Sequence, residues 1–185
     1  MSNQFYTSRG DDGFTGLLGE GRVEKSSARI DALGDVDEAG SALGLSRALA
    51  RSPQVPAILL QVQRDLYGLM AELAATPENA PKFRVIDAGR VAWLEAQVEA
   101  LSAQVEIPRE FIVPGDTVEG AFVDLARTVV RRAERRVAAL FHEGGFENQE
   151  ILRYLNRLSS LCFLIELAEN QASGQGKISL AKGPK

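Results

Sequence analysis

The apolar residues between positions 58 and 73 place the strongest constraint on the fold. They recur at spacings of three and four along the chain: Ile58, Leu59, Val62, Leu66, Leu69, Met70 and Leu73. Because an α-helix turns once in about 3.6 residues, this spacing puts all of them on one face of a helix. Such a face must be covered by other elements, so the segment predicts one helix of a packed bundle.

Helical patterns extend over most of the chain, and strand-like alternation is nearly absent. The expected helices cover about residues 27–49, 58–73, 88–101, 116–143 and 148–170. Asp116, with Glu119 three residues later, is predicted to cap the fourth helix, and Asn148 the fifth. Pro108 and Pro114 exclude a regular helix at 104–116, so we expect an extended connector there. The sequence therefore predicts an all-α fold, a five-helix bundle that forms one domain over residues 1–185.

Composition and charge exclude several classes of function. The 185 residues are 45% hydrophobic and carry a net charge of −4, which disfavours general nucleic-acid binding. No apolar run approaches the roughly 20 residues that span a bilayer. The N-terminus has no signal-peptide pattern, so we expect a cytoplasmic protein. The one cysteine, Cys162, and the one histidine, His142, are too few for a His/Cys metal site or a Cys–His catalytic pair, and both are expected to be structural.

The predicted fourth helix contains a run of arginines, which is the most informative stretch. "LARTVVRRAERRVAAL" (125–140) holds Arg127, Arg131, Arg132, Arg135 and Arg136 and no lysine. One interpretation is a solvated face held by ion pairs between residues three or four apart. The other is an anion clamp, because guanidinium groups bind phosphate or carboxylate in a bidentate manner and repel one another until an anion is bound.

A helical wheel divides this helix into two sides. At about 100° per residue, Arg127, Arg131 and Glu134 fall together on one side. The opposite side is predicted to face the core, and it consists of Phe122, Leu125, Val129, Ala133, Val137 and Leu140.

A glycine-rich segment, "YTSRGDDGFTGLLGEGRVEK" (6–25), precedes the first helical pattern. It lacks the ending of a Walker A loop and follows no predicted strand, so neither common nucleotide fingerprint applies. It is either a flexible arm or a nest whose main-chain N–H groups approach phosphate oxygens closely. In the second case Thr7, Ser8 and Thr15 would add hydroxyl groups and Lys25 a positive charge, with the arginine helix as the other half of the site.

Five segments, taken together and in order, resemble the signature blocks of a known family. They are the glycine-rich segment, "ALGDVDEAGSALG" (32–44), "FIVPGD" (111–116), "ARTVVRRAERR" (126–136) and "LRYLNRLSSLCF" (152–163). The family is that of the PduO-type ATP:cob(I)alamin adenosyltransferases, and the resemblance covers roughly residues 5–170. It implies a ferritin-like five-helix bundle that assembles as a homotrimer, with ATP bound between neighbouring subunits.

The resemblance also implies an activity. The 5′-deoxyadenosyl group of ATP would pass to the cobalt of reduced cob(I)alamin, giving adenosylcobalamin and triphosphate, with Mg²⁺ on the ATP phosphates. Residues 1–26 of one subunit would fold over the ATP, and a neighbour would supply the arginine helix. A cobalamin reductase or a cobalamin-dependent enzyme is a further expected partner, whereas nucleic acid and membranes are not. Residues 172–185, which are polar and glycine-rich, are expected to be a disordered tail.

Site residues are expected where positions match the family's motifs. The expected ATP-binding residues are Thr7, Ser8, Arg9, Gly10, Thr15, Gly16, Lys25, Arg131, Glu134, Arg135 and Asn156. Three catalytic positions are expected as well. Arg127 would pair with Asp37 across the subunit interface, and Phe111 would lie against the corrin and help remove the lower axial base from cobalt.

Several positions depart from the family's usual pattern on the side expected near the corrin. They are Gly40, Asp116, Asp124, Ser160 and the pair Glu166–Leu167. One alternative is therefore a catalytically weak or inactive relative that binds ATP or corrinoid as a carrier, sensor or regulator. Another is an interaction bundle whose arginine helix only joins subunits.

Overall fold

The computed structural model describes residues 8–174 and 178–182, which form five α-helices and one small sheet. The elements in chain order are β1 (Phe14–Gly16), β2 (Arg22–Glu24), α1 (Ala28–Leu49), α2 (Val55–Ala74), the 3₁₀ helix η1 (Ala80–Phe83), α3 (Ala88–Ser102), α4 (Val118–His142) and α5 (Glu150–Ala172). The prediction of a helical bundle is confirmed, and each helix lies where its apolar pattern was found. Within the described ranges, no helix combines the length and the apolar character needed to cross a bilayer.

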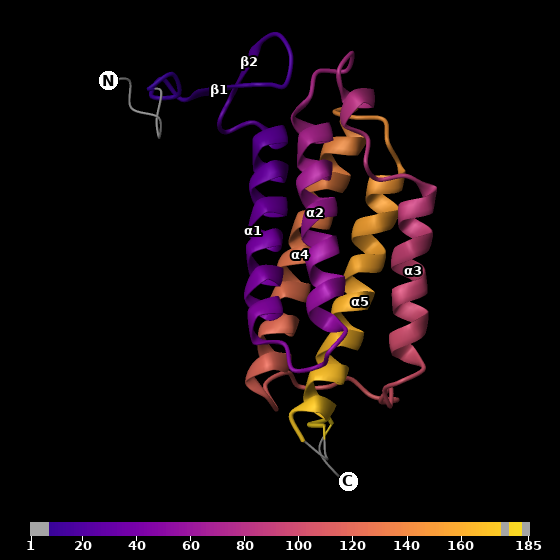
Figure 1. Ribbon diagram of the computed structural model, residues 1–185. Coiled ribbons are helices and arrows are strands. Elements are labelled where there is room, and N and C mark those ends of the chain that lie inside the picture. Colours follow the sequence, from indigo (N-terminus) through magenta and orange to yellow (C-terminus); the bar gives the residue numbers. More distant parts are fainter. Residues whose placement is uncertain (1–7, 175–177, 183–185) are drawn as a thin grey trace, which may run out of the picture.

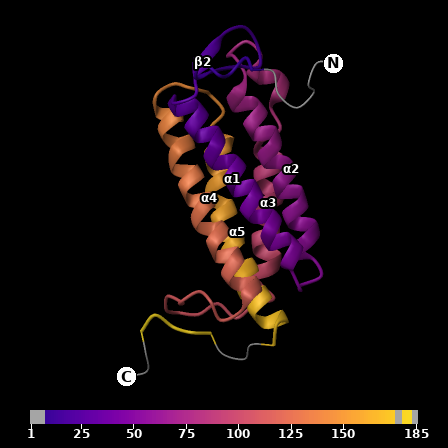
Figure 2. The same cartoon turned by 90° about the vertical axis from the view of Figure 1, so that its left-hand side faces the viewer.

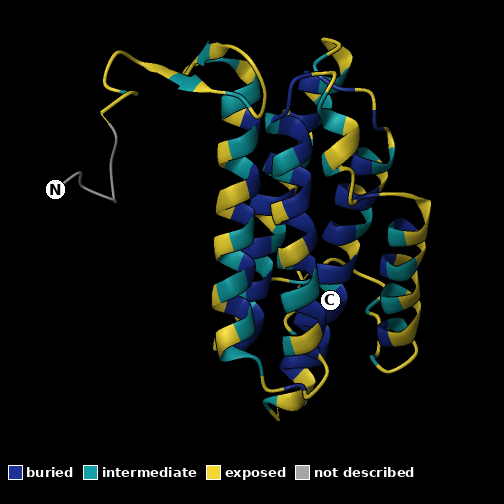
Figure 3. Ribbon diagram, turned by 45° about the horizontal axis from the view of Figure 1, so that its top comes forward, coloured by how far each residue is buried: buried dark blue, intermediate teal, exposed yellow. Residues whose placement is uncertain are grey.

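The helices stand side by side along a common direction (Figure 1). Helix α1 packs against α2 and α4, α4 also packs against α5, and α5 also packs against α3. The apolar stripe of α2 faces the core as predicted, with Leu59, Val62, Leu69 and Leu73 fully buried. Buried residues line the inner sides of the helices, while exposed residues follow the outer sides (Figure 3).

The glycine-rich segment contains the two strands that the sequence analysis missed. Strands β1 and β2 pair antiparallel with Thr15 opposite Val23. The sequence shows no strand pattern here because each strand has only three residues. The hairpin depends instead on glycine, with Gly13 and Gly21 at φ of 83° and 108°. Leu18 at the hairpin tip joins the end of α2, since its N–H donates to Ala74 O at 2.9 Å. The segment thus has a defined fold and an anchor on the bundle.

Two local predictions about α4 are wrong. The residue that caps α4 is Thr117, whose hydroxyl accepts from the Gly120 N–H at 3.0 Å. Asp116 instead accepts from the hydroxyl and the N–H of Ser179, at 2.7 and 2.8 Å. Leu125, expected in the core, is 52% exposed. Phe122, also expected in the core, is only half-buried, whereas Val129, Ala133, Val137 and Leu140 are buried as predicted. Because α4 packs between α1 and α5, its buried side extends to Val123, Ala126 and Val130.

The connector between α3 and α4 is non-helical, as its prolines predict, and residues 178–182 run beside it (Figure 2). The Val113 N–H donates to Ser179 O at 2.8 Å, and the Ala181 N–H donates to Phe111 O at 2.7 Å. This part of the tail, for which the sequence predicted disorder, therefore pairs with the connector and fixes its backbone. At the other end of the bundle, the N-cap of α5 is Gln149, which makes no side-chain cap hydrogen bond, so the prediction that Asn148 caps α5 is wrong by one residue. Asn148 Oδ1 accepts the Glu150 N–H at 3.2 Å.

A buried carboxylate, Asp65, links three helices. It is 1% exposed and lies on α2, and its Oδ2 accepts from Tyr154 OH on α5 and from Arg90 Nε on α3, each at 2.7 Å. The guanidinium of Arg90 lies over the ring of Trp93 at 4.2 Å. Burial, together with the negative charge of Asp65, raises the pKa of Tyr154 well above its usual value, so its hydroxyl stays a donor. The helices α2, α3 and α5 are thereby held in one register.

We expect Asp65→Ala to lower the free energy of unfolding by about 3 kcal/mol or more, because it leaves the Arg90 charge without its partner. Tyr154→Phe is the matched control, since it removes one neutral donor and should cost about 1 kcal/mol. Both values are measured by urea denaturation monitored by circular dichroism. Equal losses in the two variants would contradict the role given to the ion pair.

Candidate functional site

A cavity of about 700 Å³ opens between the connector, α3, α4 and α5. Its wall is mainly apolar and consists of Val98, Ile107, Pro108, Phe111, Ile112, Pro114, Phe163 and Leu164. Polar groups enter from the connector, α3, α4 and α5, and they are Ser102, Arg109, Glu110, Asp124, Arg127, Arg131, Ser159, Ser160 and Glu166. The structure therefore brings three of the predicted site residues, Phe111, Arg127 and Arg131, to one cavity.

Phe111 is the most exposed large apolar side chain among the described residues, at 89%. It projects from the connector at the rim of the cavity, and its carbonyl is held by the Ala181 N–H. An aromatic ring so exposed beside an apolar cavity marks a surface for contact with a ligand or a partner.

The arginines of α4 divide into two groups. Arg132 forms ion pairs with Asp35 and Glu38 of α1, and Arg136 lies 3.6 Å from Asp35. These two arginines tie α4 to α1, whereas the sequence predicted ion pairs between residues three or four apart on one helix. Arg131 is exposed at the cavity, and within the described ranges it has no carboxylate partner. Arg131 is thus available to an anion.

Arg127 pairs within its own helix. Its Nε donates to Asp124 Oδ1 at 2.7 Å, and its NH2 lies 2.6 Å from the same oxygen. Asp37, its expected partner, is exposed on α1 in a shallow depression beside Leu33 and Tyr67. The fold of a single chain does not bring Arg127 and Asp37 together.

Glu134 and Asn156 meet between α4 and α5. The amide of Asn156 donates to Glu134 Oε1 at 2.9 Å and accepts from Arg157 at 3.0 Å. On the same side of α4, Arg135 donates to Arg131 O at 3.1 Å. Four of the predicted ATP-binding residues therefore form a continuous polar strip beside the cavity: Arg131, Glu134, Arg135 and Asn156.

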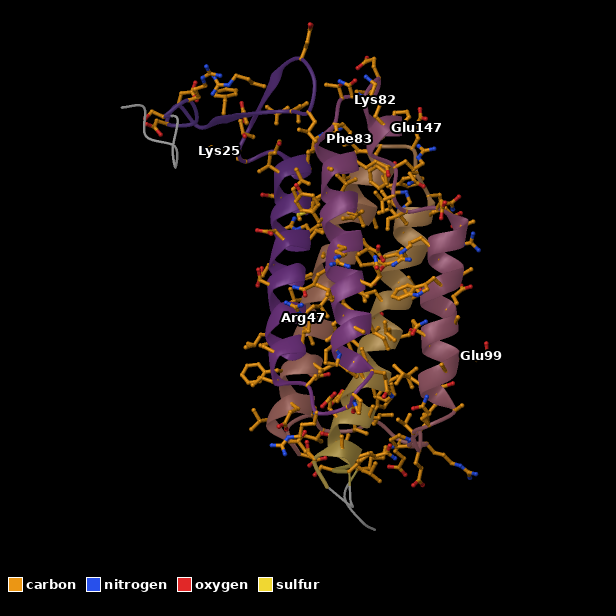
Figure 4. All side chains as sticks on the ribbon, in the orientation of Figure 1. Lys25, Arg47, Lys82, Phe83, Glu99 and Glu147 are labelled. Atoms are coloured by element: carbon orange, nitrogen blue, oxygen red, sulfur yellow. The ribbon has the colours of Figure 1, made fainter. Side chains whose placement is uncertain are left out.

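The other predicted ATP-binding residues lie in the glycine-rich segment, beyond the end of the bundle where α1 begins. Lys25, labelled in Figure 4, donates from Nζ to Gly10 O at 2.8 Å. A Cβ at Gly10 would lie 2.9 Å from that Nζ, so glycine permits this close approach. Ser8 and Arg9 precede the hairpin, whereas Thr15 and Gly16 lie in β1. Thr7 is outside the described residues.

Glu166, noted in the sequence only as a departure from the family's motif, is the most unusual group of the cavity. It is 1% exposed, and neither carboxyl oxygen has a hydrogen-bond partner among the described residues. The pKa of Glu166 is raised from 4.5 to about 7: burial is the largest cause, repulsion by Asp124 and Asp116 adds to it, and Arg127 opposes the shift. One signal for this group was present in the sequence, because a glutamate lies inside the apolar run "LCFLIEL" of α5.

Fold and site together define a class of protein: a helical bundle with an apolar cavity edged by guanidinium groups, and with a glycine-rich hairpin at one end. A family model described as "Cobalamin adenosyltransferase" matches residues 5–169. The chain belongs to the cobalamin adenosyltransferase family.

Several curated proteins are similar over most of the chain. A corrinoid adenosyltransferase from Bacillus subtilis is 37% identical over 179 residues, which are 95% of this chain and 91% of that protein. A cobalamin adenosyltransferase from Cupriavidus metallidurans is 40% identical over 174 residues, 91% of this chain and 89% of that protein. The corrinoid adenosyltransferase PduO of Citrobacter freundii is 37% identical over 94% of this chain, which spans only 52% of that longer protein.

Solved structures of the same type share the fold. A phenylalanine-to-histidine variant of a PduO-type ATP:corrinoid adenosyltransferase from Lactobacillus reuteri, complexed with cobalamin and ATP, superposes with a TM-score of 0.88. It is 30% identical, and the match covers 98% of each chain. An arginine-to-lysine variant complexed with ATP gives a TM-score of 0.86 at 29% identity, over 96% of this chain and 100% of that one.

We expect Glu166→Gln to stabilise the protein above pH 7 and to have little effect near pH 4.5. The folded wild-type protein retains a proton on Glu166 between pH 4.5 and about 7 that the unfolded chain releases, so its stability falls as pH rises through this window. The gain at pH 8 is expected to reach about 2 kcal/mol, because water in the cavity screens part of the charge. Urea denaturation from pH 4.5 to 8 measures the free energy of unfolding of both proteins. A difference between Glu166→Gln and wild type that does not change with pH would contradict the prediction.

Proposed function

We propose that this protein is an ATP:corrinoid adenosyltransferase, which moves the 5′-deoxyadenosyl group of ATP to the cobalt of a reduced corrinoid and releases triphosphate. The observation that carries the proposal is the junction of an apolar cavity with a strip of guanidinium groups. Phe111 lies on the apolar side of this junction and Arg131 on the cationic side. An apolar macrocycle and a polyphosphate can therefore lie next to each other.

The corrinoid occupies the cavity between the connector and α5. The volume of about 700 Å³ is within the range of roughly 300–1,000 Å³ that is typical of ligand sites. Phe111 lies against the macrocycle and displaces the lower axial base. An apolar site that leaves cobalt without a lower axial ligand favours reduction of Co(II) to Co(I), because it destabilises Co(II), the more highly charged of the two states.

The ATP lies along the strip formed by Arg131, Glu134, Arg135 and Asn156. Its other side is covered by residues 7–25 of a neighbouring subunit, including Thr7, the Ser8–Gly10 turn, Thr15, Gly16 and Lys25. Support comes from the hairpin, which stands beyond the bundle end and whose tip, at Leu18, is hydrogen-bonded to Ala74, Thr76 and Asn79. Such a hairpin can reach a neighbour without unfolding its own bundle.

The reaction needs positioning and charge stabilisation more than acid–base chemistry. Co(I) is a strong nucleophile, so it attacks C5′ of the ribose, a Co–C bond forms, and the C5′–O bond breaks as triphosphate leaves. The protein holds the two reactants in line. Guanidinium groups and Lys25 stabilise the negative charge that gathers on the leaving group.

Magnesium fits the same strip. Glu134 accepts from Asn156 through Oε1, and no residue in the described part of the chain donates to its second oxygen, so that oxygen can face a cation. Mg²⁺ is usually held by one or two carboxylates together with substrate phosphates and water. Bound there, it would neutralise the phosphates and orient the triphosphate as leaving group.

The active form is a homotrimer with the sites between subunits. The depression on α1 and α2 that contains Asp37 also exposes Tyr67, at 74%, which suits a surface covered by another copy. In the trimer Asp37 approaches Arg127 of a neighbour.

Sedimentation velocity is expected to give a trimer for the wild-type protein and a weaker trimer for Asp37→Ala. A wild-type monomer would contradict this assembly.

The decisive test of the function is optical. The protein is mixed anaerobically with reduced cobalamin, ATP and magnesium, and the conversion to adenosylcobalamin is followed by absorbance, with ATP omitted as control. Conversion supports the proposal. Binding of ATP without conversion would favour a carrier or sensor, which the substitutions around the cavity, such as Asp124 and Ser160, also motivate. Absence of ATP binding at millimolar concentration would favour an interaction bundle.

Arg131→Ala is expected to weaken ATP binding by about 1.5–3 kcal/mol, the usual worth of a hydrogen bond to a charged group. Isothermal titration calorimetry measures the affinity. The matched control is Arg153→Ala, because Arg153 is an exposed arginine of α5 that pairs with Glu150 outside the strip. Equal affinities for wild type and Arg131→Ala would rule out the clamp.

Phe111→Ala is expected to impair removal of the lower axial base and cobalt reduction, while ATP affinity stays unchanged. The absorption spectrum of bound Co(II) cobalamin reports the axial base directly. Val113→Ala serves as control, since Val113 is a half-exposed residue of the same connector that does not line the cavity. A variant with a native spectrum would refute the role of the ring.

A further inference from the structure

The cavity contains one buried acid that the proposed reaction does not use. Glu166 of α5 belongs to the cavity wall, is 1% exposed, and has no hydrogen-bond partner for either carboxyl oxygen among the described residues. Buried polar atoms nearly always have such a partner, so each exception calls for an explanation.

Within residues 8–174 and 178–182, the groups around Glu166 do not supply that partner. Arg127 is the nearest favourable charge, but its Nε and NH2 are both directed to Asp124 Oδ1. Asp124 and Asp116 repel a charge on Glu166, and Asp116 accepts from Ser179. A ligand with a hydrogen-bond donor in the cavity can therefore supply the partner.

The chemistry of this corner selects the ligand group. Two carboxyl groups, Asp124 and Glu166, lie at the same part of the cavity wall, so they favour hydrogen-bond donors and repel another carboxylate. The periphery of cobalamin carries primary carboxamides, each with two N–H donors and one carbonyl acceptor. A protonated Glu166 pairs with such an amide through two hydrogen bonds, and an ionised Glu166 accepts from its NH₂ group.

We propose that Glu166 determines which corrinoids this cavity accepts, binding a peripheral carboxamide and rejecting a corrinoid that carries a carboxylate at that position. The inference rests on the proposed function, since it places the corrinoid in this cavity. Contact requires the Glu166 side chain to rotate toward the cavity, and no hydrogen bond holds it in its present position. Glu166 acts here on specificity and takes no part in the transfer itself.

The rejection of carboxylates depends on pH. Because the pKa of Glu166 is raised to about 7, its carboxyl is mostly neutral at pH 6 and mostly ionised at pH 8. Repulsion of a ligand carboxylate therefore grows over this interval, while Asp124, Asp116 and Arg127 contribute a background that Glu166→Gln leaves in place. A purely structural role of Glu166 would give no such dependence.

The test compares cobalamin with its monocarboxylates, in which one peripheral amide has been hydrolysed to the acid. Dissociation constants are measured by optical titration of the full chain with Mg·ATP present, at pH 6 and pH 8. We expect the wild-type protein at pH 8 to bind at least one monocarboxylate about tenfold or more weakly than cobalamin. In Glu166→Gln and Glu166→Ala, the ratio of the monocarboxylate dissociation constant to that of cobalamin should fall below about threefold and lose its dependence on pH.

Two controls separate specificity from folding. Glu150→Gln removes an acid on the first turn of α5 that pairs with Arg153, and it should keep the wild-type ratio. Affinity for ATP should be the same in all variants, which shows that each is folded.

Each remaining outcome decides a different claim. If the wild-type protein adenosylates cobalamin but the Glu166 variants keep its ratio and pH dependence, the inference is wrong and the proposed function stands. If the wild-type protein binds no corrinoid at all, both are wrong.

Discussion

The burial of α5 is the constraint on which the rest of the structure depends. Most of its side chains are buried, and α3 and α4 pack along it. Tyr154 also joins it to Asp65 of α2, so its rotation about its own axis is fixed. That rotation decides which residues of α5 face the cavity, among them Ser159, Phe163 and Glu166. The core and the candidate site are thus two consequences of one packing arrangement.

The arginines of α4 illustrate how stability and function are divided along one helix. Arg132 and Arg136 are turned to the carboxylates of α1, where they hold the two helices together. Arg131 and Arg127 lie at the cavity, one exposed and one held by Asp124. Helical periodicity separates the two groups because successive positions point in different directions. A chain without Asp35 would leave more positive charge unpaired at the contact between α4 and α1.

Segments without helical periodicity lie at both ends of the bundle. The connector supplies Phe111 and the apolar rim, and residues 178–182 hold its backbone in place. The glycine-rich hairpin is fixed at Leu18 and by the contact of Lys25 with Gly10. These parts lie on a rigid bundle, which is how a small domain places functional loops accurately.

The sequence by itself determined the helices, the extended connector and the arginine helix, because apolar spacing and proline act locally. Its motifs also pointed to the family, and the residues Phe111, Arg127 and Arg131 do meet at one cavity. Only the tertiary structure decided that Thr117 caps α4, that Leu125 is exposed and that the glycine-rich segment forms a hairpin. It alone revealed that Asp65 links three helices and that Glu166 is buried with no hydrogen-bond partner in the described part of the chain. These features depend on which elements pack together, and a local pattern does not encode contacts between residues about a hundred positions apart, such as Arg132 with Asp35.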